Sequence, residues 1–171
     1  WQADKSFMTL AQAMVLDLSL TGVQATYLGG ATIRGIEMLT LATGAANDVI
    51  TTLRAGFNDT VTTNGGNDRV FVGGGRDVVS MGAGTDTLVL DWSGYGYGVS
   101  DSGVPEGSLG LGYNGNFNTY YDSTNRVDFS GVEHFQLTLT DHVDVITTGD
   151  GNDVVSSNGS DDTLRTGRGV D

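Results

Sequence analysis

Aspartate recurs at a fixed nine-residue step in two parts of this chain. The first series is Asp59, Asp68, Asp77 and Asp86, and the second is Asp144, Asp153, Asp162 and Asp171. Asp48 precedes the first series by eleven residues, as if two residues were inserted near 54–55. Nearly every one of these aspartates is followed two positions later by an aliphatic residue: Ile50, Val61, Val70, Val79, Leu88, Ile146, Val155 and Leu164. Self-similarity at a short fixed period indicates a repeat architecture.

A turn-forming stretch precedes these aspartates, as in GGGRD at 73–77, GAGTD at 82–86 and GDGND at 149–153. Glycine, with Asn64 and Asn158 standing in for it, allows the positive φ angles of a tight turn. The residues after each aspartate, such as 78–80, place one aliphatic side chain inward and form a minimal β-strand. Two nonapeptides therefore make one coil of 18 residues. This coil predicts the stacked pairs Asp59 with Asp77, Asp68 with Asp86, Asp144 with Asp162, and Asp153 with Asp171.

The composition favours a hard cation between these stacked turns. The chain has 18 Asp against 3 Glu, and stacked carboxylates repel one another unless a cation lies between them. Oxygen ligands from flexible turns suit Ca²⁺ far better than Zn²⁺ or copper. Aspartate is also a common turn residue, which explains one Asp-Gly turn but not a nine-residue step held through many turns.

Charge and cysteine content exclude several other classes. The net charge is −13 with a single lysine, Lys5, so the chain lacks the basic patches that bind nucleic acid and is repelled by an anionic membrane surface. No apolar run is long enough for membrane insertion. The absence of cysteine excludes disulfides and thiolate metal sites, which leaves bound metal as the expected stabiliser.

These stretches resemble the G-G-x-G-x-D-x-U-x nonapeptide of the repeats-in-toxin (RTX) family, with three consecutive copies at 63–88. The resemblance implies an all-β fold, a parallel β-roll or β-solenoid, with Ca²⁺ between successive turns. Each ion takes carboxylate oxygen from the aspartate and carbonyl oxygens from the glycine-rich turn. The family also implies type I secretion and folding on extracellular calcium.

The expected metal ligands follow from this resemblance. The aspartates are Asp68, Asp77, Asp86, Asp153 and Asp171, with Asp59 and Asp162 in less regular turns, and Asp48 and Asp144 either binding calcium or only capping the roll. The turn glycines are Gly66, Gly73, Gly75, Gly82, Gly84, Gly149, Gly151, Gly167 and Gly169. Departures from the pattern are Ala46, Phe57 and Ser160 at the fourth turn position, and a glycine-free turn at 139–143.

The repeats belong to a larger duplication. Residues 35–39 match 131–135 at an offset of 96, and 15–17 match 89–91 at an offset of 74, so the second copy carries 22 extra residues. We expect two repeat units, 1–91 and 92–171, in one continuous solenoid with extra flanking β-strands at 13–20, 32–41, 87–92 and 127–139. Residues 5–14 are compatible with a short helix. Glu37 and Glu133 occupy equivalent positions, which indicates a shared structural role such as binding a backbone amide or an ion.

The extra material, 93–126, is rich in Gly, Asn, Ser and aromatic residues. Its tyrosines are Tyr95, Tyr97, Tyr113, Tyr120 and Tyr121, and it also holds Phe117. Exposed aromatics among amides suit sugar binding. The alternative is a glycine-rich β-excursion whose aromatics cover the end of the roll.

No enzyme is expected, because the sequence lacks a nucleophile elbow, an H-E-x-x-H helix and a phosphate loop. His134 is replaced by Met38 in the other copy and is interpreted as a strand-surface residue. His142 is interpreted as a solvated or metal-assisting residue of the glycine-free turn. Three functions compete: a structural and secretion module of a large extracellular or cell-surface bacterial protein, a calcium-dependent adhesin module that binds glycan or a host surface, and an accessory domain of a secreted enzyme. The edge near residue 171 invites pairing with neighbouring repeats of a parent protein.

Overall fold

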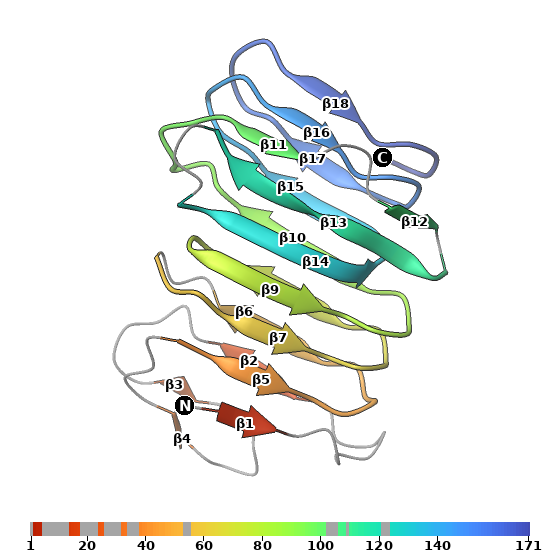
Figure 1. Ribbon diagram of the computed structural model, residues 1–171. Helices are drawn as coiled ribbons and strands as arrows, with labels where there is room; N and C mark the ends of the chain where they lie inside the picture. Colours follow the sequence, from red (N-terminus) through yellow and green to blue (C-terminus); the bar gives the residue numbers. More distant parts are fainter. Residues whose placement is uncertain are drawn as a thin grey trace.

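The structure is a computed structural model that describes residues 2–4, 14–17, 24–25, 32–33, 38–52, 56–101, 106–108, 110–120 and 124–171. Every regular element in these residues is a β-strand, so the described chain is all-β. The strands lie as rungs of one stack, with the two termini near opposite ends (Figure 1). Within the described part, no helix is long and apolar enough to cross a membrane.

Two large sheets make up the stack. Sheet A has ten strands in the order β1-β5-β7-β9-β14-β13-β11-β16-β18, with β12 beside β13. Their bounds are β1 Gln2–Asp4, β5 Thr40–Ala42, β7 Thr60–Thr62, β9 Arg76–Ser80, β11 Val99–Asp101, β12 Glu106–Ser108, β13 Gly112–Thr119, β14 Arg126–Val132, β16 Val145–Thr147 and β18 Thr163–Arg165. Sheet B has six strands in the order β17-β15-β10-β8-β6-β2, namely β2 Val15–Asp17, β6 Val49–Thr52, β8 Arg69–Val72, β10 Thr87–Asp91, β15 His134–Thr138 and β17 Val154–Ser156. A separate antiparallel pair joins β3 Gln24–Ala25 to β4 Thr32–Ile33.

From β5 to β10, successive strands alternate between sheets A and B, and from β7 onward each pairs in parallel with the strand two before it. Val61 of β7 lies opposite Val79 of β9, a step of 18 residues. The step is 20 residues from β5 to β7 and from β6 to β8, where Ile50 lies opposite Val70. Both 20-residue steps contain 54–55, so the predicted two-residue insertion and the predicted 18-residue coil are confirmed.

The aliphatic residue two positions after each aspartate points into the space between the sheets. Ile50 and Val70 are fully buried in the core cluster, which extends through Leu88. Burial weakens toward the C-terminal strands, where Val155 is only partly buried and Leu164 is 39% exposed. Most of the inward residues in the repeats are Val or Ile, so the core of each coil is thin and contributes only about 2 kcal/mol per buried side chain.

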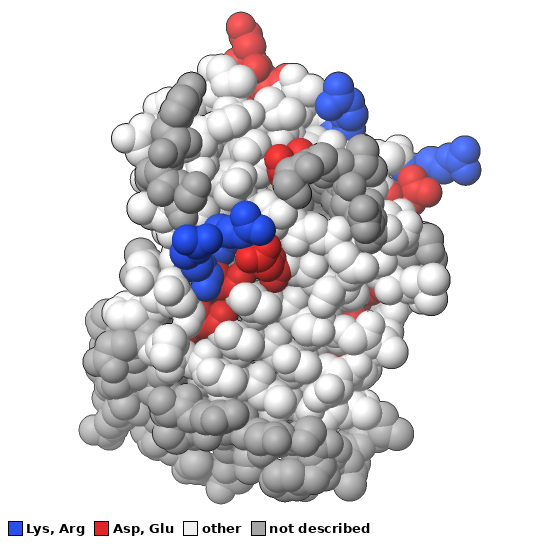
Figure 2. All heavy atoms as spheres, in the orientation of Figure 1, with Lys and Arg blue, Asp and Glu red and all other residues white. Residues whose placement is uncertain are grey.

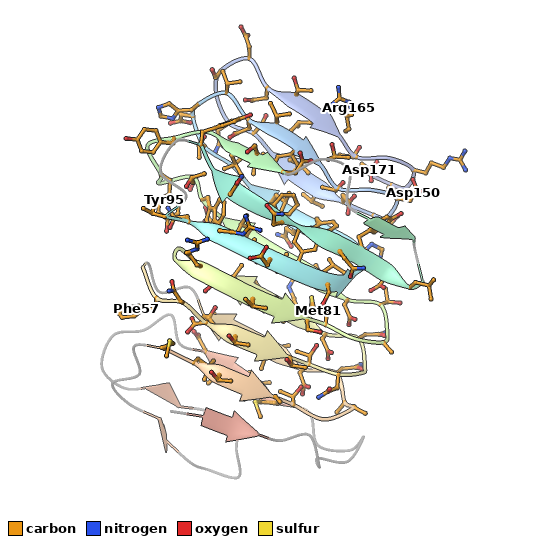
Figure 3. All side chains as sticks on the ribbon, viewed as in Figure 1. Phe57, Met81, Tyr95, Asp150, Arg165 and Asp171 are labelled. Atoms are coloured by element: carbon orange, nitrogen blue, oxygen red, sulfur yellow. The ribbon has the colours of Figure 1, made fainter. Side chains whose placement is uncertain are left out.

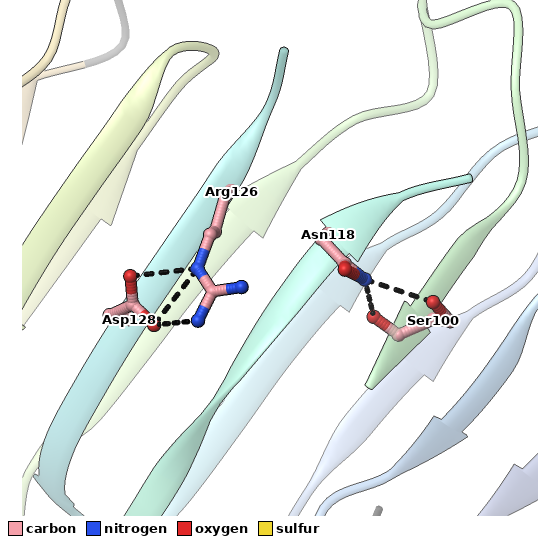
Figure 4. A network of polar contacts seen from close by, with 4 residues as sticks. All are labelled: Ser100, Asn118, Arg126 and Asp128. Carbon is pink, nitrogen blue, oxygen red and sulfur yellow. Dashed lines mark hydrogen bonds and ion pairs between the residues drawn. The ribbon is translucent and has the colours of Figure 1, made fainter. Parts of the chain in front are cut away.

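The inserted residues 93–126 widen sheet A alone. β13 pairs antiparallel with both β14 and β11, and β11 pairs in parallel with β16. Sheet B passes directly from β15 to β17. Asn118 Nδ2 donates to Ser100 Oγ at 2.9 Å between β13 and β11, and Arg126 forms an ion pair with Asp128 on β14 (Figure 4). The described strands of the excursion are therefore built into sheet A between β14 and β16, and not placed at the end of the stack.

Aromatic side chains fill the wider core that these strands create. Phe117 is fully buried and lies 5.0 Å from Phe129 and 5.6 Å from Phe135, measured between ring centroids. Tyr113 is 6% exposed, and its hydroxyl accepts a hydrogen bond from the Asp150 amide at 2.9 Å. These rings belong to the core.

The duplicated segments occupy equivalent turns but opposite sheets. Leu39 N donates to Asp59 Oδ1 at 2.7 Å, and its counterpart Phe135 N donates to Asp153 Oδ1 at 2.8 Å. Leu39 precedes β5 of sheet A, whereas Phe135 lies in β15 of sheet B. Because one nonapeptide is half a coil, the same sequence can supply a strand to either sheet.

The expected strands are found in shorter form. Residues 13–20 give β2, 87–92 give β10, and 127–139 divide into β14 and β15 at Glu133. Of 32–41, β4 and the start of β5 are described. The helix considered at 5–14 lies outside the described residues except for Met14.

Candidate metal centre

The nine aspartates of the repeats stand at the ends of turns along two edges of the stack. Turns that follow strands of sheet A end at Asp48, Asp68, Asp86, Asp153 and Asp171, which we call row I. Turns that lead from sheet B to sheet A end at Asp59, Asp77, Asp144 and Asp162, which we call row II. Asp171 stands at the C-terminal end of row I (Figure 3).

Within each row, an aspartate binds the coil that precedes it. Asp68 N donates to Asp86 Oδ1 at 2.7 Å, and Asp59 N donates to Asp77 Oδ1 at 2.9 Å. The same bond joins Asp144 N to Asp162 Oδ1 at 2.9 Å and Asp153 N to Asp171 Oδ1 at 3.1 Å. The structure thus brings together the four aspartate pairs that the 18-residue coil predicts.

Asp48 and Asp144, the two least regular candidates, take part in the same ladder. Asp48 N donates to Asp68 Oδ1 at 2.8 Å, and Asp48 Oδ1 accepts from Met14 N. Asp144 Oδ1 accepts from Val99 N, so its partner is a residue of the insertion. Both aspartates are at most 1% exposed.

Glycine is required in these turns because the coils approach closely. At Gly75, with φ of 115°, an added Cβ would lie 1.9 Å from the Phe57 carbonyl oxygen. At Gly84 it would lie 1.7 Å from the Gly66 carbonyl oxygen. Turn carbonyls therefore face the neighbouring coil. Asn64, Asn158 and Ser160 have positive φ, as glycine would have at these positions.

Burial raises the pKa of the aspartates that the coils enclose. Asp77 and Asp86 are at most 2% exposed, and desolvation raises the pKa of each to about 7. Desolvation raises the pKa of Asp68 to about 6. The pKa values of Asp48, Asp144 and Asp153 are raised in the same direction by the same cause. At neutral pH these carboxylates lose hydration without gaining a cationic side chain, because no ion pair to any of them is found within the described residues.

In three row I aspartates the second carboxylate oxygen has no hydrogen-bond partner. Oδ2 of Asp48, Asp68 and Asp86 is buried and accepts no hydrogen bond. Among the described residues, no three His, Cys, Asp or Glu side chains converge on one point. A cation held here would therefore take one or two carboxylates and complete its shell with turn carbonyls, which is the mixture that Ca²⁺ accepts. The buried, partnerless oxygens and the facing carbonyls fit such an ion.

Comparison with known families bears on the same turns. The pattern described as the RTX calcium-binding nonapeptide repeat matches residues 55–88 and 140–171, in four copies. The chain carries RTX calcium-binding repeats. These matched ranges contain eight of the nine row I and row II aspartates and omit Asp48; Glu133 also lies outside them. No curated protein and no solved structure gives a significant match to the chain.

The RTX turns also rely on threonines that the sequence interpretation missed. Thr63 is fully buried and its hydroxyl donates to the Met81 carbonyl of the next coil at 2.9 Å, and Thr43 donates to the Thr63 carbonyl at 3.0 Å. The Thr148 hydroxyl donates to Asp153 Oδ2. A threonine five residues before Asp48, Asp68 and Asp153 was the available signal.

Glu133 and His134, the two other polar residues singled out in the sequence that the structure describes in this region, both form hydrogen bonds to the backbone. Glu133 is 3% exposed and its Oε2 accepts from Asp86 N at 2.8 Å, which confirms the expectation of an amide-binding role for this residue. Glu37 lies outside the described residues. His134 is half-buried and its Nδ1 accepts from Asn152 N at 2.9 Å.

The tyrosines of the insertion divide into buried and accessible rings. Tyr113 is a core residue, and Tyr121 lies outside the described residues. Tyr95 packs edge-on against Trp92, with ring centroids 6.1 Å apart, while Tyr97 is 46% exposed. Tyr97 lines two open hollows of about 550 and 470 Å³, the first shared with Tyr95 and the second with Tyr120.

The distribution of charge on the surface agrees with the burial of the repeat aspartates. On the face shown in Figure 2 the coloured Asp and Glu side chains form a few small groups, several beside Lys or Arg, within a largely uncharged surface. Much of the formal charge of −13 instead lies in the turns, where seven repeat aspartates are at most 5% exposed.

Proposed function

We propose that this chain is a structural module of a secreted or cell-surface bacterial protein and folds as a parallel β-roll around several Ca²⁺ ions. The observation that carries the proposal is the column of buried Asp68 and Asp86, whose Oδ2 atoms have no partner. Carboxylates in such a place are unfavourable unless a cation binds them. We further propose that all nine row I and row II aspartates, with the turn glycines, contribute to these sites, and that 1–91 and 92–171 are two repeat units of one solenoid.

We expect folding to depend on neutralisation of the carboxylate charge in the turns. Without a cation, stacked carboxylates repel and the glycine-rich turns have a high conformational entropy to lose. Ca²⁺ supplies the positive charge, and about six ions would offset ~12 negative charges, close to the formal excess. Since an ion held between coils stabilises only the folded chain, binding and folding are coupled. This coupling suits a protein that is exported unfolded and folds where calcium is plentiful.

A direct test is the calcium stoichiometry of the purified chain after chelation, measured by isothermal titration and by metal analysis after dialysis. We expect several ions per chain and no comparable uptake of Mg²⁺, which requires smaller, near-octahedral sites. Asp68→Asn should lose at least one ion, whereas Asp91→Asn, at an exposed site on β10, should lose none. A chain that binds no calcium would refute the proposal.

The hollows beside Tyr97 favour a second function, recognition of a saccharide at a cell or host surface. The larger hollow combines Tyr95 and Tyr97 with the polar groups of Asn58, Arg76 and Asn125. Aromatic rings stack on the apolar faces of sugars, and amide and guanidinium groups bind their hydroxyls. A glycan array probed with calcium-loaded chain and with Tyr97→Ala tests this function. Binding that Tyr97→Ala leaves unchanged would place the saccharide elsewhere.

A further inference from the structure

The carboxylate column of row I continues beyond the repeats. Sheet B aligns Thr87 with His134, so Glu133 follows Asp86 in the stack although 47 residues separate them. Glu133 Oε2 accepts from Asp86 N at 2.8 Å. Asp86 Oδ1 accepts from Asp68 N at 2.7 Å in the same way. Glu133 therefore makes the contact that the aspartate of a next nonapeptide would make.

The corner that carries Glu133 is shorter than a nonapeptide turn. β14 ends at Val132 and β15 begins at His134, whereas 81–86 separate β9 from β10. Gly131, with φ of 67°, stacks on Gly82, because an added Cβ would lie 2.7 Å from Gly82 N and 2.9 Å from Gly82 O. The corner thus contacts the turn at Gly82 and Asp86, while residues 82–85 of that turn remain exposed.

The charge at this junction is not balanced by protein groups. Asp86 is fully buried and Glu133 is 3% exposed, and no ion pair to either is found within the described residues. Asp86 Oδ2 is buried without a hydrogen-bond partner. Backbone amides of Asp48, Asp68 and Asp86 donate to the three stacked carboxylates of Asp68, Asp86 and Glu133 in turn.

We propose that Glu133 is a calcium ligand that closes the first set of repeats, holding an ion between the turn at 82–86 and the corner at 131–133. This inference rests on the proposed calcium-binding function and adds a site outside the matched repeat ranges. The ion would join the first repeats to the strand that follows the insertion, β15. Row I would then bind calcium on both sides of the insertion, although the nonapeptide pattern is interrupted there.

The test compares bound ions in the intact chain and in Glu133→Gln. Glutamine keeps an oxygen that can accept the Asp86 amide but lacks the negative charge. We expect Glu133→Gln to bind one ion fewer than the parent chain, by native mass spectrometry and by calcium titration. Asp91→Asn removes the same charge from an exposed position of β10 and should bind the full number. An unchanged ion count and unchanged affinities in Glu133→Gln would overturn the inference and leave the proposed function intact, while a parent chain without calcium would overturn both.

A second measurement does not depend on how the variant folds. Crystals of the parent chain loaded with Tb³⁺ should show an anomalous peak about 2.5 Å from a Glu133 carboxylate oxygen. Peaks confined to the nonapeptide turns, with none at Glu133, would overturn the inference even if Glu133→Gln failed to fold.

Discussion

Replacing Asp77 by Asn should change stability in opposite directions with and without calcium. Asparagine is nearly the same size and keeps an oxygen to accept the Asp59 amide, which donates at 2.9 Å. The substitution therefore removes the charge and leaves most of the packing in place. Asp77 is 2% exposed, and desolvation raises its pKa from 3.8 to about 7.

The size of the effect follows from that pKa. One pKa unit corresponds to ~1.4 kcal/mol, so ionisation of Asp77 above pH 7 opposes folding of the metal-free chain by at most ~4 kcal/mol. Allowing for water penetration into a thin core, we expect Asp77→Asn to raise the metal-free free energy of unfolding by ~1–3 kcal/mol. With calcium at one hundred times its dissociation constant, loss of one site should lower the free energy of unfolding of the calcium-loaded chain by ~2.7 kcal/mol.

The assay is urea unfolding followed by circular dichroism, in EDTA and in calcium. If the metal-free chain is unfolded, the midpoint of folding induced by trimethylamine oxide reports the same difference. Asp91→Asn, at an exposed position, is the control and should change stability little in either condition. Destabilisation of similar size in both conditions would refute the reasoning, because it would mean that the charge of Asp77 does not oppose metal-free folding.

Three further predictions follow from the turns and the core. In chelator, the free energy of unfolding should be greatest below about pH 4 and fall as pH rises through 6 to 7, because the folded pKa values of Asp68, Asp77 and Asp86 are raised. In calcium the trend should reverse, since protons compete with the metal, and equilibrium unfolding across pH 4 to 8 measures both trends. Gly75→Ala should destabilise the calcium-loaded chain by more than ~2 kcal/mol through its contact with the Phe57 carbonyl, whereas Gly94→Ala, with open space around it, should be close to neutral. Val70→Ala in the buried core should cost about 2 kcal/mol in urea unfolding, against less than about 0.5 kcal/mol for Val154→Ala at a 61% exposed site, and equal costs would contradict the assigned core.

The repeat geometry could be predicted from the sequence because its period is short and its residue types are specific. The nine-residue step predicts the 18-residue coil, and the eleven-residue gap before Asp59 predicts the 20-residue steps between β5 and β7. The stacked aspartate pairs follow from the same arithmetic. Positive φ at Asn64 and Asn158 follows from turn chemistry.

The insertion could not be placed in the same way, because its strands pair with partners that the repeat does not specify. Its composition suggested exposed aromatics, yet Tyr113 and Phe117 fall at odd positions of 112–119 and are buried, while Asn114, Asn116 and Asn118 alternate with them. That alternation was a strand signal within a glycine-rich segment. Which sheet receives the strands depends on long-range packing, and so does the placement of the duplicated units on opposite sheets.

The role of Glu133 could be predicted only in part from the sequence. Its equivalence to Glu37 predicted a structural contact, but the partner, Asp86 N, is 47 residues earlier in the chain. Only the pairing of β10 with β15 brings the two together. Sequence could therefore indicate the kind of contact and not the coil to which it belongs.

The most direct test of calcium-coupled folding is a calcium titration of the chelated chain followed by far-ultraviolet circular dichroism, with magnesium as the control ion. The buried aspartates of both rows predict a transition from disorder to β-structure at sub-millimolar to millimolar calcium, and none with magnesium. A spectrum that is already folded in chelator and does not respond to calcium would contradict the account, because the aspartate ladders would then be ordinary turns.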